Sequence, residues 1–138
     1  MRISGDSPFM DAALVDQVVR CYRDTAPDIA TNVHPRTYPA GMSVEVISTG
    51  ILEKLDRDVQ AMADREHVTK YLYVHADGYR IENVAAPASL RDVDLALDTE
   101  DDFALAKWLA NEVADDADLN TIIDAARRFG ARQSENVT

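Results

Sequence analysis

The pattern of apolar and polar residues predicts helices that alternate with strands along the chain. Apolar positions at helical spacing predict helices after Asp11, after Ser48 or Thr49, across residues 68–75, after Thr99 and after Asp116. Short apolar or alternating runs predict strands at residues 29–33, 44–47, 79–84 and 93–97. Such alternation is typical of an α/β layered domain.

Residues at the expected helix ends support this interpretation. Asp11 can cap the first helix, and Thr99 with Asp102 forms a capping-box-like start. Gly130 is expected to end the last helix, with a loose tail from Ala131. We therefore expect a partial α/β domain over residues 1–114, followed by a C-terminal helix and tail over residues 115–138.

The first residues of the chain predict only a very short strand. Met1 to Ser4 form at most a short strand before a Gly-Asp-Ser-Pro turn. A central strand of a parallel sheet needs neighbours on both sides. If Ile3 lies on such a strand, the strands that should pair with it are absent. We therefore expect a sheet that lacks some of its strands.

The charge and hydropathy of the chain indicate which classes of partner are not expected. The 138 residues suit one domain, and 25 acidic residues against 14 basic ones give a net charge of -11. Without a basic stripe, binding to nucleic acid is not expected. The acidic excess fits either a halophilic source or an acidic cytosolic protein. With no apolar run near ~18 residues and no signal peptide, we expect a cytoplasmic protein without a membrane partner.

Two aspartates are candidate metal ligands. Asp6 lies in the Gly-Asp-Ser-Pro turn, and Asp98 follows the predicted strand at residues 93–97. Ligands of open α/β sheets bind at strand ends, and Mg²⁺ is commonly held there by one or two carboxylates together with substrate phosphates. Either aspartate can instead serve as a local cap. The sequence contains no Gly-rich phosphate loop and no Gly-x-Ser-x-Gly nucleophile motif.

Other polar residues could contact a ligand. Arg36 and Tyr38 lie in a loop framed by prolines, where an Arg fork could pair with a carboxylate or phosphate. Arg65, Glu66 and His67 open a predicted helix. They point in different directions on a helix, so contact of all three with one ligand is not expected. A solvent-exposed Arg36 and a helix-dipole role for Glu66 are the alternatives.

Four blocks occur in an order typical of one family. They are Ser-Gly-Asp-Ser-Pro-Phe-Met-Asp (4–11), Asn-Val-His-Pro-Arg-Thr-Tyr-Pro-Ala-Gly-Met-Ser-Val-Glu-Val (32–46), Asp-Arg-Glu-His-Val-Thr (64–69) and Leu-Asp-Thr-Glu-Asp-Asp (97–102). Together they closely resemble the spore-coat polysaccharide type of cytidylyltransferase. That type is similar to the synthetases that couple CTP to ketodeoxyoctonate, sialic acid and related sugar acids.

The resemblance implies a nucleotide-diphospho-sugar transferase-like fold of three layers with a mixed sheet, of which this chain is the C-terminal part. It implies CMP-sugar synthesis for surface polysaccharide, with CTP and a sugar or sugar acid as substrates and a homo-oligomeric state. Asp6 and Asp98 are the implied Mg²⁺ ligands. The implied sugar-side residues are Arg36, Tyr38, Glu45, Arg65, Glu66 and His67.

One departure from the family concerns activity. Family members begin with a strand and an Arg/Gly/Ser/Lys-rich loop that binds the triphosphate, and these 138 residues contain no such loop. Loops of that kind supply much of the binding of a nucleotide. We therefore predict that the chain alone has no transferase activity. The alternatives are a non-catalytic interaction or dimerisation module, or an unrelated α/β protein whose motif matches arise by chance.

Overall fold

A four-stranded mixed sheet forms the centre of the protein. The structure, a computed structural model, describes residues 1–62, 65 and 69–135. The strands are β1 (Arg2–Ile3), β2 (Ile29–Thr31), β3 (Val44–Ile47) and β4 (Ile81–Asn83), in the spatial order β1-β3-β2-β4. β3 pairs antiparallel with both β1 and β2, whereas β2 pairs parallel with β4. The predicted α/β fold with a mixed sheet is confirmed.

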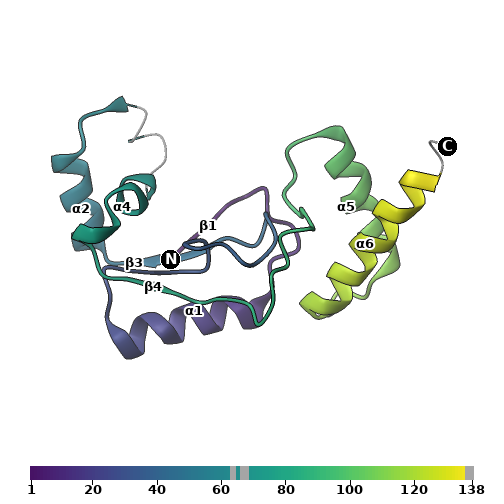
Figure 1. The fold of residues 1–138 in the computed structure, drawn as a ribbon, viewed down its shortest axis with the longest axis horizontal. Coiled ribbons are helices and arrows are strands. Elements are labelled where there is room, and N and C mark those ends of the chain that lie inside the picture. The colour runs from purple at the N-terminus through teal and green to yellow at the C-terminus, as the bar shows by residue number, and fades with distance from the viewer. Residues whose placement is uncertain (63–64, 66–68, 136–138) are drawn as a thin grey trace.

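Helices cover both faces of this sheet. The described helices are α1 (Ala12–Thr25), α2 (Thr49–Asp58), α4 (Lys70–Val74), α5 (Glu100–Glu112) and α6 (Leu119–Glu135), with a 3₁₀ turn η1 (Ala76–Gly78) after α4. Figure 1 shows α1 along one face of the sheet, and α2 with α4 over the other face. The antiparallel pair of α5 and α6 stands beyond the opposite end of the sheet from α2 (Figure 1).

Alternation along the strands explains the two cores. In β3, Val44 and Val46 pack with the α1 side, while Ile47 packs with Leu55 and Leu72 on the α2–α4 side. Because successive side chains of a strand point to opposite faces, Glu45 must point to the α2–α4 side with Ile47. Helices cover that side, so the Glu45 carboxylate is placed inside the protein.

Side-chain caps begin the helices where the sequence predicts. The Asp11 carboxylate accepts a 2.9 Å hydrogen bond from the Leu14 N–H, and Ser48 caps α2 in the same way. Thr99 and Asp102 form the full reciprocal capping box at the start of α5. These predictions are confirmed, and they fix where α5 begins with respect to Asp98.

Three local predictions are wrong. Residues 93–97 form no strand, because their ladder is a single isolated bridge between Asp94 and Ala40. Val93 and Leu95 are nevertheless buried, which explains the alternation in the sequence. The helical spacing after Ser48 also predicts Met62 on the apolar stripe of the second helix, but α2 ends at Asp58 and Met62 is 86% exposed. Helix α6 continues through Gly130 to Glu135, since glycine weakens a helix without having to end it.

The two ends of the chain differ in packing. β1 is an edge strand of the described sheet, and both of its residues are exposed. Ile122, Ile123, Ala125 and Ala126 of α6 are buried in the same core as Leu14 of α1. The predicted boundary between residues 114 and 115 stays a prediction.

Within the described part of the chain, no helix is both long enough and apolar enough to cross a membrane.

Candidate functional site

The strand register aligns four polar residues across the sheet. Arg2 of β1 pairs with Glu45 of β3, Glu45 pairs with Thr31 of β2, and Thr31 pairs with Asn83 of β4. Residues directly opposite each other on neighbouring strands share a face and lie within contact distance. This polar row therefore lies on the face that α2 and α4 cover.

Glu45 is the centre of the row. Its residue exposure is only 3%, and its two carboxylate oxygens have different partners. Oε2 accepts a 2.7 Å hydrogen bond from Arg2 Nη1, while Oε1 accepts bonds from the Thr69 hydroxyl, at 2.8 Å, and from the Tyr73 hydroxyl. A buried carboxylate needs such partners, since an unpaired buried charge is costly.

Tyr73 links this carboxylate to the neighbouring strand and loop. Its hydroxyl oxygen also lies 3.1 Å from the Thr31 hydroxyl, and its ring stacks on His34 with the ring centroids 5.1 Å apart. Burial and the hydrogen bond to Glu45 raise the pKa of Tyr73 well above its usual value. The phenol therefore stays protonated and remains a donor to Glu45 at neutral pH.

A cavity of about 270 Å³ opens beside this network. Its lining includes three cationic side chains, Arg2, Arg36 and Lys70, and one carboxylate, Glu45. Ser4, Val33, Ser43, Thr69 and Tyr73 complete it. In a chain with a net charge of -11, this lining is locally cationic, which suits an anionic or polar ligand.

Two loop contacts hold Arg36 at the cavity. Arg36 Nη1 donates a 3.1 Å hydrogen bond to the Pro39 carbonyl, and Nη2 donates a 2.8 Å bond to the Ser43 hydroxyl. The loop is fixed to the sheet by Asn83, whose side-chain carbonyl accepts a 3.0 Å hydrogen bond from the His34 N–H. The guanidinium is thus held by neutral partners, and none of its described bonds goes to a carboxylate.

Asp6 and Asp98 lie in neighbouring backbone segments. The Leu97 N–H donates a 3.0 Å hydrogen bond to the Asp6 carbonyl, so the residue before Asp98 is bonded directly to Asp6. Both residues are exposed; the Asp6 carboxylate accepts a 3.2 Å bond from the Ser7 hydroxyl, and no described side chain is bonded to the Asp98 carboxylate. No group of three or more potential metal ligands occurs among the described residues.

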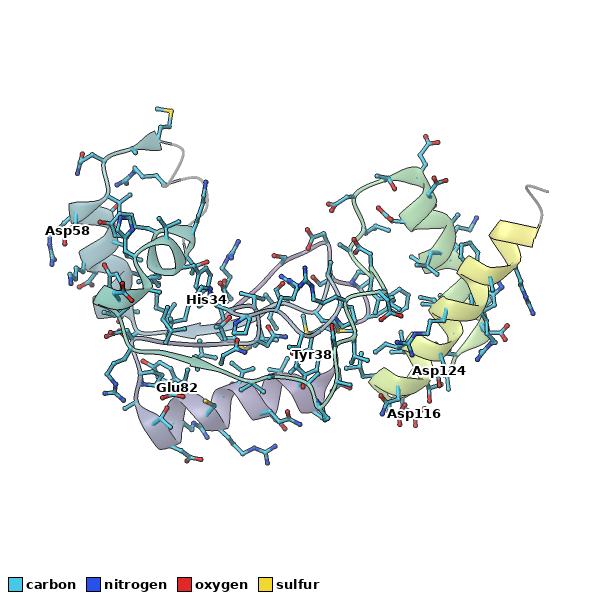
Figure 2. All side chains as sticks on the ribbon, in the orientation of Figure 1. His34, Tyr38, Asp58, Glu82, Asp116 and Asp124 are labelled. Carbon is cyan, nitrogen blue, oxygen red and sulfur yellow. The ribbon has the colours of Figure 1, made fainter. Side chains whose placement is uncertain are left out.

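The remaining candidates lie elsewhere. Tyr38 is 7% exposed within the core on the side of α5 and α6, away from His34 (Figure 2), and burial together with the Asp11 charge raises its pKa. Arg65 donates to the carbonyls of Asp56 and Val59 at the end of α2. Neither residue lines the cavity. Glu66 and His67 lie outside the described residues.

Thus two of the predicted site residues, Arg36 and Glu45, line one cavity. The other residues that line it were not predicted from the sequence. Thr69 immediately precedes α4 and Tyr73 lies within it, and their spacing of four residues places both on the side of α4 that faces the sheet. That spacing was a usable signal. The pairing of Arg2 with Glu45 was not readable, because it depends on an antiparallel register between segments 43 residues apart.

Comparison with a solved structure defines the fold class. The fold matches a cytidylyltransferase from Leptospira borgpetersenii serovar Hardjo-bovis with a TM-score of 0.83 and 22% sequence identity, over 92% of this chain and 55% of that one. The fold class is therefore the α/β fold of that cytidylyltransferase.

Sequence comparison identifies the relatives more closely. The chain is 30% identical to the spore coat polysaccharide biosynthesis protein SpsF of Bacillus subtilis over 124 residues, 87% of this chain and 50% of SpsF. It is also 30% identical to an uncharacterized protein of Methanocaldococcus jannaschii over 107 residues, 76% of this chain and 43% of that protein. No family model matches. The chain is homologous to SpsF, which confirms the resemblance, and it spans about half the length of these curated relatives.

Proposed function

We propose that this chain is the acceptor-side part of a nucleotidyltransferase that activates a sugar or sugar acid with CTP. The observation that supports the proposal is the cavity around Glu45 and Arg36, which residues of three of the four sequence blocks line. The chain that forms it is homologous to SpsF and has a cytidylyltransferase fold. Its size of about 270 Å³ admits a monosaccharide-sized group, and its polar lining offers donors to hydroxyls.

Asp6 and Asp98 are the residues that we propose to hold Mg²⁺. Two exposed carboxylates in neighbouring segments fit this ion, which takes few protein ligands and completes its octahedron with water and substrate phosphates. When bound, Mg²⁺ would neutralise charge on the phosphates during transfer. The protein's own contribution is to fix the Asp98 segment against the Asp6 turn through the Leu97 hydrogen bond.

The proposed reaction is attack of an acceptor oxygen on the α-phosphate of CTP, with pyrophosphate as the leaving group. A new P–O bond forms to the acceptor while the bond between the α- and β-phosphates breaks, and the acceptor proton is lost. Catalysis of such transfers is mostly positioning and electrostatic stabilisation. Arg36 and Glu45 would position the acceptor, and Asp6 with Asp98 would position the metal.

The activity of these 138 residues is tested separately from that of the whole protein. We predict that the chain alone releases no pyrophosphate from CTP with Mg²⁺ and a sugar acid. A chimera would join the chain to the half of SpsF with which it does not align. We expect the chimera to bind CTP in a Mg²⁺-dependent way that Asp6→Asn and Asp98→Asn each weaken, measured by calorimetry. A chimera that folds but binds CTP equally well with and without these carboxylates contradicts the metal assignment.

A second candidate is an interaction module, for which an exposed aromatic face provides the support. Phe103 on α5 is 55% exposed, and it lines a groove of about 480 Å³ with Trp108 and Phe129. Exposed apolar surface of this kind is typical of contact sites. A homo-oligomer that uses this face should dissociate in the Phe103→Glu variant, as measured by light scattering. A monomer at all concentrations in the unsubstituted chain contradicts it.

A further inference from the structure

A second hollow of the surface, with a volume of about 590 Å³, lies between the first turn of α1 and the turn that joins α5 to α6. Residues 8–13 form one wall of this groove, and residues 110 and 113–118 form the other. Figure 1 shows the start of α1 and the start of α6 side by side at the lower edge of the molecule. The groove shares no lining residue with the cavity around Glu45, so it is a separate feature of the surface.

The floor of the groove is apolar. Phe9, Met10 and Val113 line it and are half-buried against the core, and the buried Ile122 also lines it. The walls carry alanines, among them Ala110, whose methyl groups are too short to fill the space between the walls. An apolar hollow of this size falls within the range of protein binding sites, about 300–1,000 Å³. The groove can therefore take an apolar group of another molecule.

The charges that line the groove have one sign. Among its lining residues are the four carboxylates of Asp11, Asp115, Asp116 and Asp118, and no cationic side chain. Asp11 and Asp118 each accept a backbone N–H at the start of a helix, where the partial positive charge of that helix offsets them. Within the described part of the chain, the side chains of Asp115 and Asp116 have no hydrogen bond or ion pair. Figure 2 shows Asp116 beside the start of α6, so two uncompensated charges lie next to the apolar floor.

The combination of an apolar floor and uncompensated carboxylates restricts what fits the groove. A neutral apolar ligand would leave Asp115 and Asp116 uncompensated, and a small hydrophilic cation would leave the floor exposed to water. A second copy of a chain with a net charge of -11 is disfavoured by repulsion. A segment of another protein can present apolar and cationic side chains together, as amphipathic helices do when they bind in apolar grooves.

We propose that this groove binds a basic, amphipathic segment of a partner protein. An apolar side chain of that segment lies on the floor, and its lysine or arginine side chains lie beside Asp115 and Asp116. Contact with the floor supplies most of the affinity, while the complementary charges supply specificity and speed association. The inference does not rest on the proposed transfer reaction, since the groove lies outside the cavity that we assign to the acceptor.

The experiment titrates the full 138-residue chain with three short synthetic peptides at constant ionic strength. The first peptide has leucines at helical spacing and lysines at its other positions. The second replaces the leucines with serines, and the third replaces the lysines with glutamates. Binding is followed by shifts of backbone amide signals in two-dimensional NMR. We expect saturable shifts at residues 9–13 and 113–118 with the first peptide, binding of the second that is weaker by about tenfold or more, and none of the third.

Charge variants test the role of the two free carboxylates. Asp115→Asn combined with Asp116→Asn should weaken binding of the leucine–lysine peptide by about fivefold. Asp16→Asn combined with Asp24→Asn is the matched control, because it removes the same charge from exposed positions of α1 outside the groove. The control should stay within about twofold of the unsubstituted chain. Added NaCl should weaken binding more steeply in the unsubstituted chain than in the variant without the charges of Asp115 and Asp116.

An alanine variant tests the apolar floor. Ala110→Phe places a ring where the peptide side chain should lie, so we expect binding weaker by about tenfold. Ala104→Phe is the matched control, because Ala104 is also exposed on α5 but does not line the groove. The dispersion of the amide signals shows that each variant is folded before its affinity is compared.

Several results would overturn the proposal. These are shifts spread over the whole acidic surface, binding of the serine peptide as tight as that of the leucine peptide, and equal losses of affinity in the groove variants and their controls. Spermidine that binds the groove as tightly as the leucine–lysine peptide would identify a small cation as the ligand instead. Shifts of the same residues that grow with the concentration of the chain alone would identify a second copy as the occupant.

Discussion

The backbone N–H of Leu97 donates a 3.0 Å hydrogen bond to the backbone carbonyl of Asp6. This bond joins two segments that are far apart in the sequence and places the turn around Asp6 next to the residue that precedes Asp98. On the other side of Leu97, the reciprocal capping box of Thr99 and Asp102 fixes the start of α5. Asp98 is therefore held between a backbone bond and a helix cap.

This arrangement predicts cooperation of the two carboxylates in metal binding. Asp6→Asn and Asp98→Asn should each weaken binding of a divalent cation by about tenfold or more, because each removes one of two charged oxygen ligands. Mn²⁺ as a paramagnetic probe should broaden the NMR signals of residues 5–7 and 97–99, and added Mg²⁺ should reverse the broadening.

Asp16→Asn provides the matched control for these variants. Asp16 is exposed on α1, so its replacement changes the net charge equally without touching either segment. Broadening in this variant should be unchanged. Equal broadening in Asp6→Asn, Asp98→Asn and Asp16→Asn would show that cations associate only with the general acidic surface.

Gly41 allows the segment that leads to Asp98 to pack closely against the backbone of residue 41. Its φ is +79°, and a Cβ atom there would lie 2.4 Å from the Leu95 carbonyl carbon. Gly41→Ala should therefore lower the free energy of unfolding by about 2–4 kcal/mol, from backbone strain and overlap. It should also speed exchange of the Leu97 amide. Urea unfolding and hydrogen exchange measure the two effects.

Gly78→Ala is the control for this substitution. Nothing lies within 4 Å of a Cβ built on Gly78, so the change should stay within about 0.5 kcal/mol. If the two alanine variants unfold at the same urea concentration, the close approach of Gly41 to Leu95 is not a constraint in solution.

These cases show which parts of the fold are readable from the sequence. Local signals predicted the caps at Asp11 and Thr99 correctly, because a cap depends on residues three apart. The segment with Val93 and Leu95 alternates like a strand because those side chains are buried, yet it lacks a ladder. A strand in a sheet and an extended segment with alternate side chains buried both show alternating apolar and polar residues. This alternation alone does not show whether the backbone pairs with another strand.

Only some residues of the candidate site could be predicted from the sequence, because the others depend on contacts between distant segments. Arg36 and Glu45 stand in quoted motifs, and the structure brings both to one cavity. Arg2 and Lys70 reach that cavity through strand register and through the packing of α4 on the sheet. Neither relation has a local signature, so both residues were missed, whereas Tyr38 was selected although it packs in the core.

Tyr73 provides a test of the Glu45 network. Tyr73→Phe keeps the ring that stacks on His34 but removes the hydroxyl bonded to Glu45, so the buried carboxylate loses one donor. We expect a loss of about 1–2 kcal/mol in the free energy of unfolding. Tyr79→Phe is the control, because no hydrogen bond of the Tyr79 hydroxyl occurs among the described residues. Equal stability of both variants in urea would contradict the network.

The capping box predicts a specific dependence on pH. Asp102 Oδ2 accepts bonds from the Thr99 hydroxyl at 2.7 Å, the Thr99 N–H at 2.8 Å and the Asp98 N–H at 3.2 Å. These bonds, with that from the Thr99 side chain largest, lower the pKa of Asp102 below its usual value of 3.8. A carboxyl with a depressed pKa in the folded state stabilises the fold above its unfolded pKa. That stabilisation is lost as the pH falls through the folded pKa, so α5 should lose helix signal at acidic pH below about 4.

Thr99→Ala separates this effect from general acid unfolding. It removes the hydroxyl but leaves the backbone N–H groups, so the pKa of Asp102 should rise toward its usual value and α5 should begin to unfold at a higher pH. Asp118 is the internal control, because its pKa is lowered by a different partner, the Thr121 N–H. Carboxyl NMR titration should show Asp102 shifted and Asp118 unchanged in this variant. If Asp102 titrates as before, the Thr99 hydroxyl does not hold its charge, and the start of α5 beside Asp98 is fixed by the backbone bonds alone.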